Sequence, residues 1–166
     1  TSTGRKPGFF HMGGQSGPIG FPEQLDTPYT YETLAPKGLA VGSGAIVVLD
    51  DSVCIVEYIQ KVFEFFVHES CGKCTPCRLG TTRILELLTD FVEDRAKDGD
   101  VERLEYMARQ VSQLSACGLG QSVNVALMSA LRHRRGDFEA HINGGACPAG
   151  ACACHENGRN KACLTI

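Results

Sequence analysis

Three cysteines fall within eight residues of this chain, in the segment Cys71-Gly-Lys-Cys74-Thr-Pro-Cys77-Arg. A fourth, Cys117, follows at a distance in Ala-Cys-Gly-Leu-Gly-Gln. Three closely spaced thiolates can hold three corners of an iron–sulfur cube, and a remote cysteine can supply the fourth ligand. A fold that uses these thiols together must bring the two segments to one place. This requirement constrains the chain more than any other feature of its sequence.

The total number of cysteines favours metal ligation over disulfide bonding. The chain has nine cysteines among 166 residues, and the odd number without an N-terminal signal peptide argues against a disulfide framework. We therefore expect thiols in a reducing compartment. A formal net charge of −3 gives no electrostatic case for a nucleic-acid partner. No apolar run approaches the ~18–20 residues of a transmembrane segment, so we expect a cytoplasmic protein, or one peripheral to a membrane complex.

Composition divides the chain into three segments. Residues 1–50 are rich in glycine and proline and end in an apolar run, 45–49, which predicts a short buried strand. This segment has strand pieces but no complete sheet. Residues 51–142 carry apolar residues at helical spacing, whereas residues 143–166 combine cysteine, histidine and glycine without apolar periodicity. The last segment needs a metal or a partner surface to become ordered.

Four amphipathic helices are predicted in the middle segment. Asp51 or Ser52 is the expected N-cap of the first helix, and the later helices are expected over residues 80–97, 101–115 and 121–138. Short loops between them predict a mainly α fold built on a four-helix bundle. In an up-and-down bundle, the loop with the three close cysteines and the loop with Cys117 lie at the same end. The four sulfurs can therefore converge there on one cluster.

Two other interpretations of these four cysteines stay open. Four thiolates also form a structural zinc site, although zinc favours paired CxxC knuckles and the observed triple favours a [4Fe–4S] cube. A structural zinc-binding assembly domain is therefore the alternative function. A redox-sensing thiol protein would instead use Cys74 or Cys77 as a nucleophile and would contain no iron.

The C-terminal tail offers a second candidate metal site, with spacing that fits neither a zinc finger nor a ferredoxin. We interpret the isolated Cys54, which lies in an apolar stretch, as a small buried hydrophobe. The tail, by contrast, has enough thiols and imidazoles for zinc or for a further cluster, and unmetallated thiols are the alternative. The predicted zinc ligands are His141, Cys147, Cys152 and Cys163, with Cys154 or His155 as substitutes.

The cysteine motifs resemble those of a known family. The runs 69–78 and 117–121 are similar to the C-terminal part of the NADH-binding flavoprotein subunit of respiratory complex I, and to relatives in NAD-linked hydrogenases and formate dehydrogenases. Upstream runs at 12–17, 25–28, 42–44 and 47–50 resemble the ubiquitin-like β-grasp domain of that family. The resemblance extends from about residue 9 to 142, and the Cys-Pro-Ala-Gly-x-Cys tail resembles the hydrogenase and electron-bifurcating branch.

This resemblance implies an electron-transfer module. It implies that Cys71, Cys74, Cys77 and Cys117 ligate a [4Fe–4S] cluster, which passes single electrons from a reduced flavin to a partner iron–sulfur subunit of a multisubunit oxidoreductase. It divides the chain into a partial β-grasp segment (1–50), a cluster-binding helical domain (51–142) and a metal-binding tail (143–166). The glycine-rich loop of the family's FMN and NADH domain is absent here. We therefore expect FMN and NAD(H) on a separate domain, so that this chain does not oxidise NADH by itself.

Overall fold

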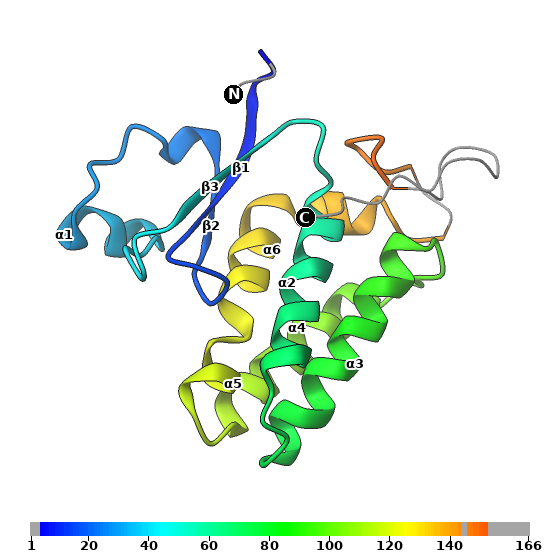
Figure 1. Ribbon diagram of the computed structural model, residues 1–166. Helices are drawn as coiled ribbons and strands as arrows, with labels where there is room; N and C mark the ends of the chain where they lie inside the picture. The colour runs from blue at the N-terminus through cyan, green and yellow to red at the C-terminus, as the bar shows by residue number, and fades with distance from the viewer. Residues whose placement is uncertain (1–3, 144–145, 153–166) are drawn as a thin grey trace.

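A small antiparallel sheet packs against a group of helices, as the ribbon of this computed structural model shows (Figure 1). The structure describes residues 4–143 and 146–152. Its strands are β1 (Pro7–Met12), β2 (Ile19–Gly20) and β3 (Ile46–Asp50), and its helices are α1 (Tyr31–Leu34), α2 (Ile55–Glu69), α3 (Thr75–Val92), α4 (Asp100–Leu114), α5 (Gly118–Ser122) and α6 (Asn124–Glu139). Two short 3-10 turns, Pro22–Gln24 and Ala35–Lys37, flank α1.

The sheet has the order β2-β1-β3, with β1 antiparallel to both neighbours. Side chains of β1 alternate between two faces. Phe9 joins the main core, where its ring meets Tyr58 of α2 edge-on at 5.3 Å, whereas Phe10 belongs to a smaller apolar cluster with Leu34 and Leu39. The sheet is therefore held on the helices by one face of its central strand.

Strand β3 forms at the predicted place, but the prediction that it is buried is wrong. Ile46, Val47 and Val48 are 49%, 51% and 50% exposed. Strand β3 packs mainly on β1, whereas β2, the other edge strand, also packs on α6 and is buried. The described part of the first fifty residues thus contributes a three-stranded sheet, and four residues separate its last strand from α2.

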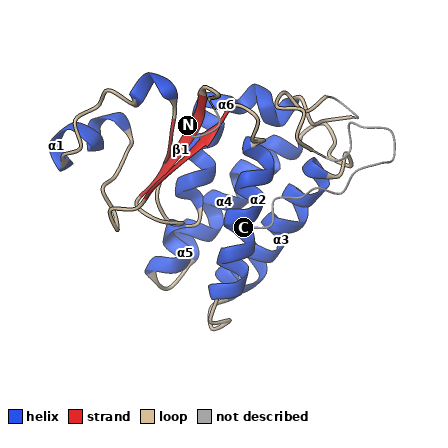
Figure 2. Ribbon diagram, turned by 45° about the horizontal axis from the view of Figure 1, so that its top comes forward, coloured by secondary structure: helices blue, strands red, loops and turns tan. Residues whose placement is uncertain are grey.

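The helical part of the described chain contains four long helices, α2, α3, α4 and α6, and the short α5. Helix α2 packs on α3 and α6, and α4 packs on α3 and α6, while the short α5 contacts α4 (Figure 2). The buried face of α2 includes Ile59, Phe63 and Phe66, at the spacing expected for an amphipathic helix. No helix of the described residues is both long and apolar enough to cross a membrane.

Three helix boundaries differ from the prediction. The N-cap of α2 is Cys54, not Asp51 or Ser52, because Ser52 donates from its backbone N–H and its hydroxyl to Asp50 Oδ1 in the preceding turn. Helix α3 begins at Thr75 rather than Gly80, since Pro76 suits the first turn of a helix. The predicted helix over 121–138 is divided into α5 and α6, and α6 has a non-helical backbone at Arg134.

Candidate metal centres

Two groups of cysteines lie at opposite ends of α2 (Figure 1). Cys54 precedes the first residue of the helix, and Cys71 follows its last residue by two positions. A helix of 15 residues is about 22 Å long. We call these groups the Cys71 site (Cys71, Cys74, Cys77 and Cys117) and the Cys54 site (Cys54, His141, Cys147 and Cys152). Among the described residues, the Cys54 site alone brings its ligand atoms within 4.8 Å of one another.

The residues of the Cys71 site come from the starts of two helices. Cys71 lies in the loop after α2, Cys74 is the N-cap of α3, and Cys77 lies in the first turn of α3. Cys117 is the N-cap of α5. The sequence predicts Cys77 in a loop, and the earlier start of α3 moves it into the helix. Cys71 and Cys117 are exposed, whereas Cys77 is buried.

The two cysteine segments are in direct contact. Backbone N–H groups of Ala116 and Cys77 lie within hydrogen-bonding reach of the Cys74 thiol. A Cβ added to Gly120 would stand 2.4 Å from the Cβ of Ser115 and 3.3 Å from the Cβ of Cys77, so glycine lets α5 pack closely against the end of α4 and the start of α3. The structure thus brings the loop before α3 and the loop before α5 together at one end of the helices.

The surroundings of the Cys71 site favour negative charge. Hydrogen bonds from the backbone N–H groups of Ala116 and Cys77 lower the pKa of the Cys74 thiol. The N-terminal ends of helices also carry positive partial charge, which stabilises nearby thiolates. Lys73 and Arg78 add full positive charges to the same segment. These features suit an anionic cluster with four thiolate ligands.

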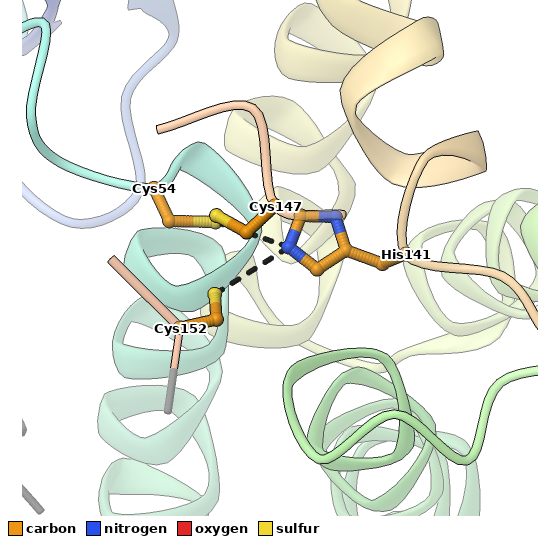
Figure 3. Close-up of side chains that lie close together, drawn as sticks. All are labelled: Cys54, His141, Cys147 and Cys152. Atoms are coloured by element: carbon orange, nitrogen blue, oxygen red, sulfur yellow. Dashed lines mark hydrogen bonds between the residues drawn. The ribbon is translucent and has the colours of Figure 1, made fainter. Parts of the chain in front are cut away.

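The Cys54 site is a tight and buried cluster of ligand atoms (Figure 3). The sulfurs of Cys54, Cys147 and Cys152 and a ring nitrogen of His141 all lie within 4.8 Å of one another. His141 Nε2 is 3.5 Å from Cys54 Sγ and 3.4 Å from Cys152 Sγ. All four residues are buried, since their exposed fractions are 2%, 1%, 6% and 4% in chain order.

Three separate parts of the chain supply these ligands. Cys54 is the N-cap of α2, and His141 stands just beyond α6. Cys147 and Cys152 belong to the segment 146–152, where the N–H of Gly150 donates to the carbonyl of Cys147 and closes a turn. Gly150 has a φ of +64°, a conformation that glycine adopts without strain. This turn folds the segment back so that both of its thiols reach the start of α2.

The imidazole of His141 is oriented for ligation. Its Nδ1 lies 2.6 Å from the carbonyl oxygen of Asp137, and a carbonyl can only accept, so Nδ1 carries the proton. Nε2 therefore presents its lone pair toward the sulfurs when the ring is neutral. A histidine ligand of a metal is held in this way, with the second nitrogen donating to a fixed acceptor.

Without a metal, the close thiols and imidazole perturb one another strongly. Burial lowers the pKa of His141, but hydrogen bonds with Cys147 and Cys54 outweigh it and raise the pKa to about 10. Hydrogen bonds from Cys152 and Cys54 lower the pKa of the Cys147 thiol, and the bond with Cys147 raises that of Cys152. Without a metal, the Cys147 thiolate is therefore paired with the protonated imidazole of His141, and a bound cation would take the place of that proton.

The distances in the Cys54 site match those of one tetrahedral ion. With Zn–S of about 2.3 Å and Zn–N of about 2.0 Å, a tetrahedron places nitrogen and sulfur ligands about 3.5 Å apart. The two distances from His141 Nε2, 3.5 and 3.4 Å, agree with this value. Three thiols and one imidazole are also an established zinc ligand set, so the donor atoms fit zinc in chemistry and in spacing.

The structure differs from the predicted tail site in one of the four ligands. His141, Cys147 and Cys152 lie together, and Cys54 takes the fourth position. The predicted fourth ligand, Cys163, and the substitutes Cys154 and His155 lie outside the described residues. Cys54 is buried as predicted, but it lies among ligand atoms rather than in a purely apolar surrounding. No local pattern around Cys54 signals this, because the nearest of its three partners along the chain is 87 positions away.

Comparisons with known proteins identify a family that covers the middle of the chain. Residues 57–141 match the family described as the NADH-ubiquinone oxidoreductase-F iron-sulfur binding region. This match contains Cys71, Cys74, Cys77 and Cys117. It begins after Cys54 and ends before Cys147, so three of the four residues of the Cys54 site lie outside it.

Curated relatives and solved structures extend the similarity to most of the chain. A subunit of the NADH-quinone oxidoreductase of Streptomyces coelicolor is 36% identical over 89% of this chain and 34% of its own length. The NADP-reducing hydrogenase subunit HndC of Solidesulfovibrio fructosivorans is 34% identical over 84% of this chain and 29% of its own. An NAD+-reducing [NiFe]-hydrogenase in its H2-reduced state superimposes with a TM-score of 0.74 at 31% identity, over 83% of this chain and 24% of that one. The chain thus spans about a third of the curated relatives that it matches.

Proposed function

Because the chain belongs to the family of NADH-ubiquinone oxidoreductase-F iron–sulfur binding regions, we propose that it is an electron-transfer module of an NADH-linked oxidoreductase complex. The family match supports a [4Fe–4S] cluster as its cofactor, and we assign Cys71, Cys74, Cys77 and Cys117 as the ligands. A bound cluster would accept and release one electron at a time. In this proposal the electrons come from FMN on a separate NADH-binding domain and leave to a partner iron–sulfur subunit.

The observation that carries the proposal is the contact between the two cysteine segments. Cys74 meets Ala116, the neighbour of Cys117, and Cys77 meets Gly120. Two cysteine segments that are distant in the sequence thereby lie side by side, which supports the binding of one cluster by both. The four helices α2, α3, α4 and α6 support this end of the molecule, and we include their action as a cluster-holding bundle in the proposal.

The protein residues at this site bind and stabilise rather than react. Thiolates of four cysteines hold the cluster, and N–H groups of Ala116 and Cys77 donate to sulfur. Lys73 and Arg78 offset the negative charge of the thiolates. None of these roles needs proton transfer or a nucleophile, so we assign no catalytic residue to this chain.

Several wider features come from the relatives and belong to the same proposal. The relatives include both NADH-quinone oxidoreductase and hydrogenase subunits, and the Cys-Pro-Ala-Gly-x-Cys tail is our reason for placing the chain in the NAD-linked or electron-bifurcating hydrogenase branch. Residues 1–50 would then be part of a β-grasp domain, and residues 143–166 a metal-binding tail. We also propose that the protein is cytoplasmic or lies at the periphery of a membrane complex.

Metal analysis with spectroscopy tests the assignment against its alternatives. The chain, purified without oxygen, should contain about four iron and four sulfide per chain and show a visible absorption that dithionite bleaches. Cys74→Ser should lose most of this iron, whereas Ser112→Ala, one turn before the second cysteine loop, should retain it. A colourless wild-type protein with zinc in place of iron would establish the structural zinc site. A protein without iron in which Cys74 is alkylated rapidly would establish the thiol sensor.

We further propose that the Cys54 site binds a structural zinc ion. The observation that favours it is the convergence of four buried ligand atoms within 4.8 Å, at spacings that fit a tetrahedral ion. Zinc has no redox chemistry, so this site would fix the segment 146–152 to the start of α2 and leave electron transfer to the Cys71 site.

The two sites can be separated by paired variants. Cys152→Ser should lose zinc and keep iron, whereas Cys74→Ser should lose iron and keep zinc, as measured by elemental analysis of each purified protein. Cobalt substitution adds a second readout, because cobalt in a tetrahedral site with three thiolates absorbs strongly in the visible range. Loss of both metals from either single variant would contradict two independent sites. Absence of zinc from the wild type would remove the second proposal alone.

A further inference from the structure

The hydroxyl of Ser115 is buried beside the Cys71 site without a hydrogen-bond partner. Ser115 follows the last residue of α4 and precedes Cys117 by two positions. It is only 5% exposed, and its Oγ makes no hydrogen bond to any atom of the described residues. A buried polar group left unpaired destabilises the fold, so a serine here requires an explanation outside the packing of the chain.

The Ser115 hydroxyl lies next to the proposed cluster ligands. On one side, a Cβ added to Gly120 would stand 2.3 Å from Ser115 Oγ, so the backbone of α5 closes that direction. The same added Cβ would stand 3.3 Å from the Cβ of Cys77, so the hydroxyl lies beside the cysteines at the start of α3, and it is one of the groups that lower the pKa of the Cys74 thiol. The Ser115 hydroxyl thus has the sulfur of Cys74 as an acceptor within reach, without a hydrogen bond of normal geometry.

A second hydroxyl approaches the site from the other cysteine loop. Ser70 Oγ lies 3.4 Å from Cys77 Sγ, and the backbone N–H of Gly72 donates to the same Oγ at 3.4 Å. Gly72 adopts a φ of +74°, a conformation that glycine accepts without strain. Since the oxygen of Ser70 already accepts from Gly72, its proton is free to be donated to the sulfur of Cys77.

We propose that Ser70 and Ser115 are positioning residues that donate hydrogen bonds to the thiolates of Cys77 and Cys74 and so raise the reduction potential of the cluster. The inference rests on the proposed [4Fe–4S] ligands. A thiolate bound to iron has no proton, so each hydroxyl must be the donor in its pair. Donors to sulfur stabilise the more negative, reduced cluster more than the oxidised one. Each cysteine loop therefore contains one serine that can raise the reduction potential of the cluster.

Potentiometric titration followed by electron paramagnetic resonance tests this inference. The chain carrying its cluster is compared with Ser70→Ala, Ser115→Ala and the double variant. Each single change should shift the midpoint potential to more negative values, and the double variant should shift it by about the sum. Ser112→Ala is the matched control, because its hydroxyl lies one turn earlier on α4 and donates to the carbonyl of Gln121 at 2.5 Å. Its potential should equal that of the wild type.

The outcomes separate this inference from the proposed function. If the wild type contains no iron, the proposed cluster fails before the serines are tested. If the cluster loads and either serine variant keeps the wild-type potential, the cluster proposal stands and the inference is overturned. Loss of the cluster from Ser115→Ala would also overturn it, since the hydroxyl would then be needed for assembly rather than for potential. In D2O-exchanged wild type, electron–nuclear double resonance should detect deuterons near the cluster that are lost in each variant.

Discussion

Cys54 Sγ and His141 Nε2 lie 3.5 Å apart, although 87 positions separate the two residues in the chain. The contact joins the start of α2 to the end of α6. Since α2 also leads into the Cys71 site at its other end, one helix connects both thiol sites (Figure 1). A metal in the Cys54 site would therefore stabilise the helix from which the cluster loop extends.

The first prediction concerns removal of metal from the Cys54 site. A strong chelator should lower the free energy of unfolding by about 3 kcal/mol or more, because structural zinc sites have apparent binding free energies of about 10–16 kcal/mol. The measurement is thermal or urea unfolding with and without chelator, followed by addition of zinc to restore stability.

The control for this prediction is Cys54→Ala, which should already be less stable and should no longer respond to chelator. Ile55→Val, a truncation at the next and equally buried position, should keep the full chelator effect. An equal response of the wild type and Cys54→Ala would contradict the assignment of Cys54 as a ligand.

The second prediction concerns the close crossing of α3 and α4. A Cβ added to Gly80 would stand 2.1 Å from Cγ2 of Val111, so Gly80→Ala should cost about 1–3 kcal/mol of stability through overpacking. In a Val111→Ala background the same change should instead stabilise by up to about 1 kcal/mol, since alanine is the better helix former. A double-mutant cycle by urea unfolding measures this reversal of sign, and additive effects would exclude the steric explanation.

Local patterns in the sequence predicted the helices well. Apolar residues at helical spacing predicted helices within 51–142, and Ile59, Phe63 and Phe66 form the buried face of α2. The resemblance inferred from the cysteine runs is confirmed by the family match and by the relatives. Helix existence and motif identity depend on nearby residues, and a single sequence contains that information.

Features that depend on distant contacts could not be predicted in the same way. An apolar run such as Ile46–Val48 looks the same whether or not a helix covers it, and only the packing of the helices on the sheet decides its exposure. Cys54 has the local sequence of a core residue, and its thiol neighbours are visible only after α2, α6 and the segment 146–152 are packed together. The non-helical backbone at Arg134 could not be predicted either, because no proline stands at that position.

The third prediction concerns the ion pairs that join α6 to α4. Arg135 Nη1 lies 3.1 Å from Glu105 Oε2, and the same guanidinium also pairs with Glu102 and Glu139. Arg135→Met should lower stability by about 1 kcal/mol at low salt and by less at high salt, because salt screens exposed pairs. Arg83→Met is the control, since Arg83 pairs with Glu86 of its own helix. It should change stability less, and equal losses would show that bridging two helices adds nothing.

The last prediction concerns acid sensitivity at the junction of sheet and helices. Burial lowers the pKa of His11 below its ordinary value of 6.5; its Nε2 donates to the carbonyl of Gly17 at 3.0 Å, and Tyr58 donates its hydroxyl to Nδ1 at 2.9 Å. The unfolded chain then binds the proton more readily than the folded one. The contribution of His11 to stability should therefore be complete above pH 6.5 and fall as the pH drops from 6.5 toward the folded pKa. Unfolding measured across this range should show a smaller fall for His11→Gln than for the wild type. His68→Gln, which removes an exposed imidazole, should retain the wild-type slope, and an unchanged slope in His11→Gln would rule out His11 as the sensitive group.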